Sequence, residues 1–294
     1  MLSCVLNVSE GRDAALLDHL AARAGAALID VHRDPDHHRA VLTLAGDDAV
    51  CEAAARAVTE AAVAAIDVRA HAGVHPRLGS VDVVPFVPLL PGALPAELAR
   101  AELGAACAAR DRFCSWVAKD LAVPCFRYGP LEHGERSLVD LRQRAFGDLE
   151  PDAGPAQPHP RAGAICAGAR RALVAYNLVL STRDLALTRR LAAQLRSPEI
   201  RALGFAVAAG AQVSCNLVAP WAVGPREAFA RLTDLAERAG VRIVATELVG
   251  LLARSLLEAI PQRDWARLDL ATERTIEARL ADRDGSGRGR VTTP

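Results

Sequence analysis

The sequence predicts an α+β fold of two ferredoxin-like subdomains, each with the element order β-α-β-β-α-β. Apolar runs of strand length alternate with segments whose apolar residues recur at helical spacing. This order occurs twice along the chain, as expected for a repeated supersecondary unit. Residues 147–168, rich in proline and glycine and without periodicity, separate the two occurrences, and we expect them to form a connector.

The first half starts with a strand, a helix and a strand–turn–strand segment. Ser9 is a favourable N-cap residue, and Leu16, Leu17 and Leu20 follow at helical spacing. The polar segment His32–His38 is expected to be a turn. The expected strands are Leu2–Val8, Ala26–Val31, Ala40–Ala45, Val81–Leu89 and Cys125–Tyr128, and the expected helices are Asp13–Ala24, Asp47–Ile66, one or two within Pro95–Leu121, and Ser137–Phe146.

The second half repeats the pattern, with a hairpin centred on Gly210 and with Gly240 at a position typical of a helix C-cap. We expect an N-terminal subdomain over residues 1–168, a C-terminal subdomain over 169–281 and a flexible tail over 282–294. The expected elements of this half are Arg171–Leu180, Asp184–Leu195, Gly204–Ala208, Gln212–Val218, Arg226–Ala239, Val241–Leu248 and Leu251–Ala259.

Composition excludes several classes of protein. Lys and Arg together number 35, as do Asp and Glu, and this balance argues against nucleic acid as a partner. The seven cysteines form no Cys-x-x-Cys pair, which favours reduced thiols in a cytoplasmic protein. No secretory leader is recognisable in residues 1–10, and no apolar run reaches the about 18 residues of a membrane span.

The segment His71–Gly79 is the strongest candidate for chemistry. Pro76 fixes its own φ and favours an extended His75, while the glycines permit tight turns. His75 should therefore lie on a kinked, exposed loop just before an apolar strand, a common placement for catalytic side chains. The alternative is an ordinary turn with solvated histidines.

Five of the eight histidines gather in two segments, residues 32–38 and 71–75. A metal site is one interpretation, but no helical His-x-x-x-His pair is present, and acid–base chemistry near neutral pH explains the histidines more simply. Arg39 and Arg77 suit carboxylate recognition, although both are also compatible with an ordinary protein surface.

The motif His-x-Gly-x-His-Pro-Arg-x-Gly with the strand that follows it resembles the formiminotransferase family, folate-dependent enzymes of histidine breakdown. The histidine before Pro-Arg, the family's proposed catalytic base, is His75 in this sequence. The resemblance extends over most of the chain, from about Cys4 to Leu252. The matching segments are Asn7–Arg12, Asp30–Val41, His71–Phe86, Gly163–Asn177 and Leu248–Leu251.

The resemblance implies a folate cleft between the two subdomains, a homodimer, and tetrahydrofolate as co-substrate. It also implies that the connector contacts folate. We expect no metal ion, and we expect Arg39 and Arg77 to bind substrate because they suit carboxylate recognition. The connector residues expected at the folate are Gly154, Pro155, His159, Pro160, Arg161 and Gly163.

Two positions depart from the family pattern. His32 stands where the family has an aspartate proposed to orient the catalytic histidine, and Val74 stands where the family has a glutamate. Because a histidine supplies no fixed negative charge, either Asp34 or Asp36 replaces the aspartate or the substrate differs. We expect His32 and Asp34 to lie with His75 in the catalytic group.

The resemblance predicts a cytoplasmic transferase that moves a formimino group from N-formiminoglutamate to N5 of tetrahydrofolate, with His75 as general acid and base. The resemblance is to the stand-alone form of the family, so we expect no cyclodeaminase domain of the kind that some relatives carry. One alternative is a related one-carbon or amidine transfer from another donor. The other is a folate-binding protein without catalysis, an interpretation that the missing aspartate at His32 favours and the presence of His75 opposes.

Overall fold

The computed structural model describes residues 1–286 and 291–292, which form two compact units. The first unit contains Met1–Leu89, Glu102–Arg170 and the described residues from Ser286 onward. The second contains Leu90–Ala101 and Arg171–Gly285. The chain therefore leaves the first unit after its fourth strand, contributes one short helix to the second unit, and returns.

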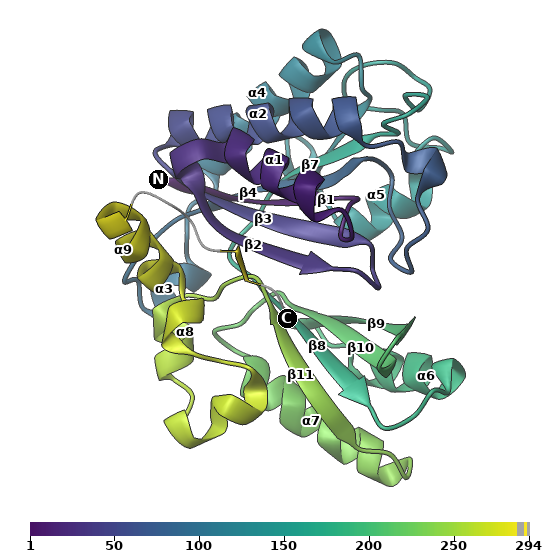
Figure 1. Cartoon of the computed structure of the whole chain (residues 1–294), viewed down its shortest axis with the longest axis vertical. Helices are drawn as coiled ribbons and strands as arrows, with labels where there is room; N and C mark the ends of the chain where they lie inside the picture. Colours follow the sequence, from purple (N-terminus) through teal and green to yellow (C-terminus); the bar gives the residue numbers. More distant parts are fainter. Residues whose placement is uncertain (287–290, 293–294) are drawn as a thin grey trace. The chain divides into compact units, whose positions relative to one another are not determined.

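The first unit is built on one sheet with the order β12-β2-β3-β1-β4-β7-β5-β6 (Figure 1). Its part β2-β3-β1-β4 is antiparallel throughout and has the ferredoxin-like order, which confirms the predicted topology. The strands are β1 (Leu2–Val8), β2 (Leu28–Asp34), β3 (Arg39–Gly46), β4 (Val81–Pro88), β5 (Cys125–Leu131), β6 (Gly134–Arg136), β7 (Ile165–Ala169) and β12 (Val291–Thr292).

Helices cover both faces of this sheet, because its strands are apolar on both sides over much of their length. One face carries the largest core cluster, in which Leu6, Leu42 and Phe86 are fully buried. On this face lie α1 (Ala14–Ala24), α2 (Asp48–Ala65) and α4 (Gly104–Asp120), as Figure 1 shows. A smaller cluster on β4, β5 and β7 packs against Leu141 of α5 (Leu138–Arg144).

Strand β7 corrects the sequence analysis, which placed all of residues 147–168 in an unstructured connector. The segment Ile165–Ala169 is instead a parallel strand between β4 and β5. Its small residues carry no period-two signal, and the packing requires one of them: a Cβ on Gly168 would lie 2.0 Å from the ring of Tyr128. A strand buried on both faces gives no alternation from which it could be recognised.

The second unit has a four-stranded antiparallel sheet with the order β11-β8-β10-β9, again ferredoxin-like as predicted. Its core contains Tyr176, Leu178 and Leu232. The strands are β8 (Val174–Leu180), β9 (Ile200–Val207), β10 (Gly210–Leu217) and β11 (Ile243–Val249), and the helices are α3 (Pro95–Ala99), α6 (Leu185–Leu195), α7 (Pro225–Arg238), α8 (Arg254–Glu258) and α9 (Ile276–Ser286).

The remaining expectations are resolved in part. The region Pro95–Leu121 forms two helices, α3 and α4. Of the tail expected over residues 282–294, residues 287–290 and 293–294 lie outside the described part, whereas α9 continues to Ser286 and residues 291–292 form β12. All seven cysteines are free thiols. No helix among the described residues is both long and apolar enough to span a membrane.

Candidate active site

The candidate residues of the first unit converge because of strand topology. In the antiparallel part of the sheet, β1 and β2 end at the edge where β3 and β4 begin. Strands β7 and β5 run parallel to β4, so they begin at this edge as well. The segments 9–13, 35–38, 66–80 and 154–164 therefore meet at one edge of one sheet.

The loop before β4 is fastened to the end of β1. Ser9 accepts no helix-capping bond; instead its amide donates to the Ser80 carbonyl at 2.8 Å, and its hydroxyl donates to the Gly79 carbonyl at 2.7 Å. Asp13, not Ser9, caps α1, by accepting from the Leu16 amide at 3.0 Å. The prediction that Ser9 caps the helix is wrong because this hydroxyl holds the loop.

The same loop packs against the turn between β2 and β3. Arg77 donates to the carbonyls of His37 at 3.0 Å and His38 at 3.2 Å. A Cβ on Gly73 would lie 2.3 Å from the His37 carbonyl oxygen, so only glycine permits this approach. Arg77 is thus engaged with the protein backbone, and its pKa is lowered to about 10, mainly by burial.

His75 lies half-buried at the centre of this arrangement, between the Pro76 carbonyl and Arg39. The Pro76 carbonyl oxygen is 2.7 Å from His75 Nδ1. Arg39 Nη1 is 2.8 Å from the same Nδ1 and 3.4 Å from Nε2. A carbonyl oxygen only accepts and favours a proton on Nδ1, whereas a guanidinium only donates and favours an unprotonated Nδ1, so the two contacts compete for this nitrogen.

Arg39 is held by two further groups. Asn7 Oδ1 accepts from Arg39 Nε at 3.0 Å and from Nη2 at 2.7 Å. Asp82 Oδ2 accepts from Nη1 at 3.2 Å. A guanidinium fixed in this way offers a preorganised positive charge beside the His75 ring.

Asp82 also joins β4 to α5 and to the loop. Its Oδ2 accepts from Arg142 Nη2 at 2.5 Å, and its Oδ1 accepts from the Leu78 amide at 2.9 Å. Arg142 Nη1 donates in addition to the Pro76 carbonyl at 2.9 Å. Burial alone would lower the pKa of Arg142, but the charge and hydrogen bond of Asp82, together with Cys166 and Tyr128, raise it.

These surroundings keep the His75 ring neutral. Burial contributes most to lowering its pKa from 6.5, and the charges of Arg39 and Arg142 lower it further. In the unliganded protein His75 is therefore a neutral imidazole at physiological pH.

The turn between β2 and β3 differs from expectation in one respect. Residues 32–34 belong to β2, so His32 lies in a strand, buried and opposite Val41, and not in a turn. Asp34 does pair with an imidazole, but that of His37, whose ring centroid is 6.0 Å from the centroid of His75. The Asp34 pKa is lowered because this pairing outweighs burial.

The connector runs along the same edge, towards the histidine loop. Gly163 bridges to Gly79, and the Arg161 carbonyl accepts from the Val68 amide at 2.9 Å. His159 Nδ1 accepts from the Ala162 amide at 3.0 Å.

The side chain of Arg161 is exposed and lies 3.6 Å from Asp67. Gly154, which has φ +94°, packs against Pro124 at the start of β5. Pro155 and Pro160 are exposed. The connector residues are thus spread along the edge, and Arg161 and Gly163 meet the segment 66–80 through their backbones.

Three residues of the site were not predicted: Asn7, Asp82 and Arg142. Asn7 and Asp82 stood inside segments that carried the family resemblance, and Asp82 is a charged residue in an otherwise apolar strand, which was a usable signal. Arg142 gave no signal, because only tertiary packing brings α5 to the loop.

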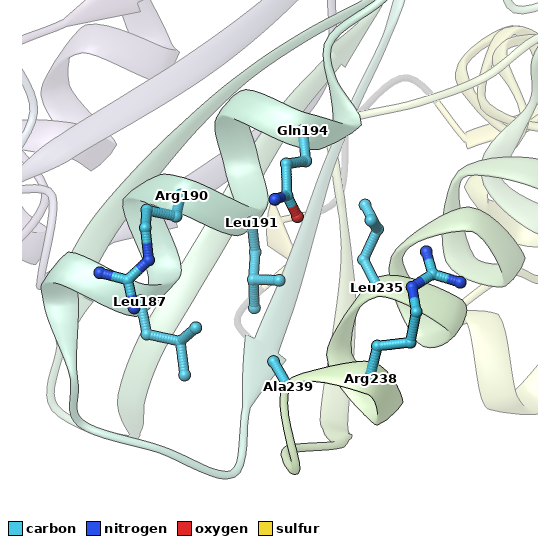
Figure 2. Close-up of a pocket in the computed structure, with 7 residues that line it drawn as sticks. All are labelled: Leu187, Arg190, Leu191, Gln194, Leu235, Arg238 and Ala239. Carbon is cyan, nitrogen blue, oxygen red and sulfur yellow. The ribbon is translucent and has the colours of Figure 1, made fainter.

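A hollow of about 280 Å³ lies between α6 and α7 of the second unit (Figure 2). It holds none of the candidate residues and no imidazole, carboxylate or thiol, so it offers no acid–base group. Its lining residues are Leu187, Arg190, Leu191, Gln194, Leu235, Arg238 and Ala239. Within the described part of the chain, no three His, Cys, Asp or Glu side chains are arranged to hold a metal ion.

Comparison with known proteins matches residues 1–170 to the formiminotransferase domain, N-terminal subdomain. The chain is 31% identical over 281 residues to the glutamate formimidoyltransferase of Streptococcus pyogenes serotype M1, covering 88% of this chain and 91% of that protein. It is 31% identical over 283 residues to the glutamate formimidoyltransferase of Thermoplasma acidophilum, covering 87% and 89%. The formimidoyltransferase-cyclodeaminase of Sus scrofa is 33% identical over 290 residues, which are 88% of this chain and 51% of that protein.

Proposed function

The chain belongs to the formiminotransferase family and is a transferase, and from this premise we propose that it moves a formimino group from N-formiminoglutamate to N5 of tetrahydrofolate. The observation that carries the proposal is the neutral His75 ring, placed between the Pro76 carbonyl and Arg39. A positioned imidazole of this kind is suited to moving one proton between two amine nitrogens.

In the proposed reaction, N5 of tetrahydrofolate attacks the amidine carbon of the donor and gives a tetrahedral intermediate. His75 Nε2 takes the proton that N5 loses. The same proton is delivered to the glutamate nitrogen as the bond from carbon to that nitrogen breaks. Glutamate leaves as an amine, 5-formiminotetrahydrofolate remains, and the imidazole returns to its neutral state.

The charges around His75 support an anionic donor. Arg39 and Arg142 place two guanidinium groups near the ring, with Asp82 as a shared counter-ion, so the cluster retains a net positive charge. We propose that Arg39 binds a donor carboxylate. A bound carboxylate would offset the positive field that lowers the His75 pKa, and so strengthen the base when substrate is present.

Tetrahydrofolate is proposed to bind along the connector, whose residues 154–163 follow the sheet edge to the His75 loop. Asp34 is proposed to support His37 beside the reacting group, in place of the family's aspartate at His32. Arg77, which holds the loop, serves positioning better than direct substrate recognition. We also propose that the protein is cytoplasmic and forms a homodimer. Light scattering of the purified chain tests the dimer.

The direct test is turnover by the intact chain. With N-formiminoglutamate and tetrahydrofolate present, glutamate should be released at a rate that requires both compounds. Formimino-glycine and formimino-aspartate serve as competing donors, because they retain the amidine and change the carboxylate spacing. Faster transfer from either would favour the related transferase, and tetrahydrofolate binding without transfer from any donor would favour a folate-binding protein.

A further inference from the structure

The carbonyl of Pro76 contacts two groups from different parts of the first unit. His75 Nδ1 lies 2.7 Å from its oxygen, and Arg142 Nη1 of α5 donates to it over 2.9 Å. Arg39 Nη1 lies 2.8 Å from the same Nδ1, so Pro76 and Arg39 favour opposite tautomers of the ring. A carbonyl oxygen has two acceptor positions, so with the ring proton on Nδ1 both positions of Pro76 are filled.

Arg142 is itself held in place by the strand that follows the loop. Asp82 Oδ2 accepts from Arg142 Nη2 at 2.5 Å, and Asp82 Oδ1 accepts from the Leu78 amide at 2.9 Å. Asp82 is 1% exposed, so little water competes for these bonds. The loop is thus tied at Pro76 and at Leu78 to a single Arg142–Asp82 pair.

We propose that Arg142 and Asp82 are positioning residues for His75: they hold the Pro76 carbonyl where it keeps the ring proton on Nδ1 and leaves Nε2 as the proton-transfer atom. This proposal rests on the proposed function for its kinetic consequence. The geometric consequence, which nitrogen carries the proton, exists without substrate.

Removal of Arg142 leaves the Pro76 carbonyl with one donor and the Asp82 carboxylate with one guanidinium fewer. The loop then gains freedom around Pro76, and the His75 ring loses its single preferred tautomer. Misplacement of a reacting group by about 1 Å costs about 100-fold in rate. We therefore expect kcat to fall about 10- to 100-fold in Arg142→Met, while KM for the donor changes less than about threefold.

The test combines kinetics with the nitrogen NMR spectrum of histidine-labelled protein. His75 signals are assigned by their loss in His75→Ala. In the wild type the His75 resonances should be those of an Nδ1–H imidazole, and in Arg142→Met they should move towards a mixture of both tautomers. Arg144→Met is the matched control, since Arg144 lies on the same helix and pairs with the exposed Asp148.

A second variant protects the test against misfolding. Arg142→Lys keeps the charge but has one nitrogen on a shorter side chain, so it cannot place donors where Nη1 and Nη2 meet Pro76 and Asp82; it should show the same tautomer shift and loss of kcat in a smaller measure. Melting temperatures accompany all variants.

Two results would overturn the proposal. One is an unchanged His75 tautomer in both Arg142 variants. The other is a large rise in KM with kcat preserved, which would make Arg142 a substrate-binding residue. A tautomer shift in a protein that transfers no formimino group would leave the positioning pair in place and reject the proposed function alone.

Discussion

The two units share one topology but differ in the connections between their strands. The ferredoxin-like order is β4-β1-β3-β2 in the first and β11-β8-β10-β9 in the second. In the first unit residues 66–80 connect the second helix to the fourth strand, whereas residues 239–242 suffice in the second. The turn between the middle strands spans 35–38 in the first unit and 208–209 in the second. The longer connections are those that carry the candidate site.

The two units also differ in their polar side chains. All eight histidines of the chain lie in the first unit. The second unit has instead a row of hydrogen bonds across its sheet, from Gln212 to Ser214 at 2.8 Å, from Ser214 to Asn177 at 2.7 Å, and from Asn177 to Glu247 at 2.9 Å. The comparison teaches that the shared topology supplies stability, and that loops inserted at one sheet edge supply acid–base groups.

The largest expected effect is the loss of rate in His75→Ala. Removal of a general base typically costs about 10²- to 10⁴-fold, and we expect kcat to fall within this range while the Kd for tetrahydrofolate changes less than about threefold. His71→Ala is the control on the same loop. Its Nε2 contacts the His38 carbonyl at 2.8 Å and also Arg77, so its loss should lower stability more than rate. A greater loss of kcat in His71→Ala than in His75→Ala would mean that His71 is the general base and His75 the structural histidine.

Arg39→Gln should lower kcat/KM for the donor by about 10- to 100-fold, because a charge-assisted bond contributes about 1.5–3 kcal/mol. The matched control is Arg69→Gln in the same unit, since Arg69 is exposed and pairs with Asp67. Equal values of kcat/KM for the two variants would show that Arg39 does not bind substrate. The site would then lack its proposed partner for the donor carboxylate.

Substituting one serine in each unit with alanine compares the two units directly. Ser9→Ala removes the bond to the Gly79 carbonyl, and Ser214→Ala removes two bonds of the sheet row. Each should lower the free energy of unfolding by about 1–2 kcal/mol. Only Ser9→Ala should also lower kcat, by a few fold, because it releases the His75 loop. A comparable loss of kcat in Ser214→Ala would show that the chemistry is not confined to the first unit.

The smallest expected effect concerns the pH dependence of stability. In the folded protein the pKa of His75 is lowered from 6.5, mainly by burial and then by Arg39. At a pH between the folded and the unfolded pKa, the unfolded chain therefore binds more protons than the folded protein. The contribution of His75 to stability is therefore present above about pH 6.5 and is lost as pH falls. In urea titrations the free energy of unfolding of His75→Gln should fall less steeply between pH 7 and pH 5 than that of the wild type. The difference in slope should correspond to at most one proton taken up on unfolding. An unchanged slope would mean that the ring is solvated and that its pKa is near normal.

The sequence predicted those parts of the fold and site that depend on local patterns. The two repeats, most helices and the His71–Gly79 loop follow from periodicity and from Pro and Gly placement. The contact between Arg39 and His75 follows from neither, because it joins residues 36 positions apart at a shared sheet edge. The resemblance to a family supplied His75 and Arg39 as candidates, and the structure supplied their contact.

The missed features have physical reasons of the same kind. Strand β7 has the sequence Ile-Cys-Ala-Gly-Ala, whose small residues are selected by close packing against Tyr128 and not by strand propensity. Arg142 lies on a short helix whose packing through Leu141 aims it at the loop. His32 was expected in a turn because its neighbours are polar, but pairing with β3 extends β2 through it.

The central claim is that proton transfer passes through Nε2 of His75, and chemical rescue tests it most directly. In His75→Gly, added imidazole should restore turnover at least tenfold with saturation, and substituted imidazoles should follow their basicity. The same additions should leave His71→Gly unchanged. The account is contradicted if His75→Gly binds tetrahydrofolate normally and no imidazole restores its rate, or if both variants are rescued equally.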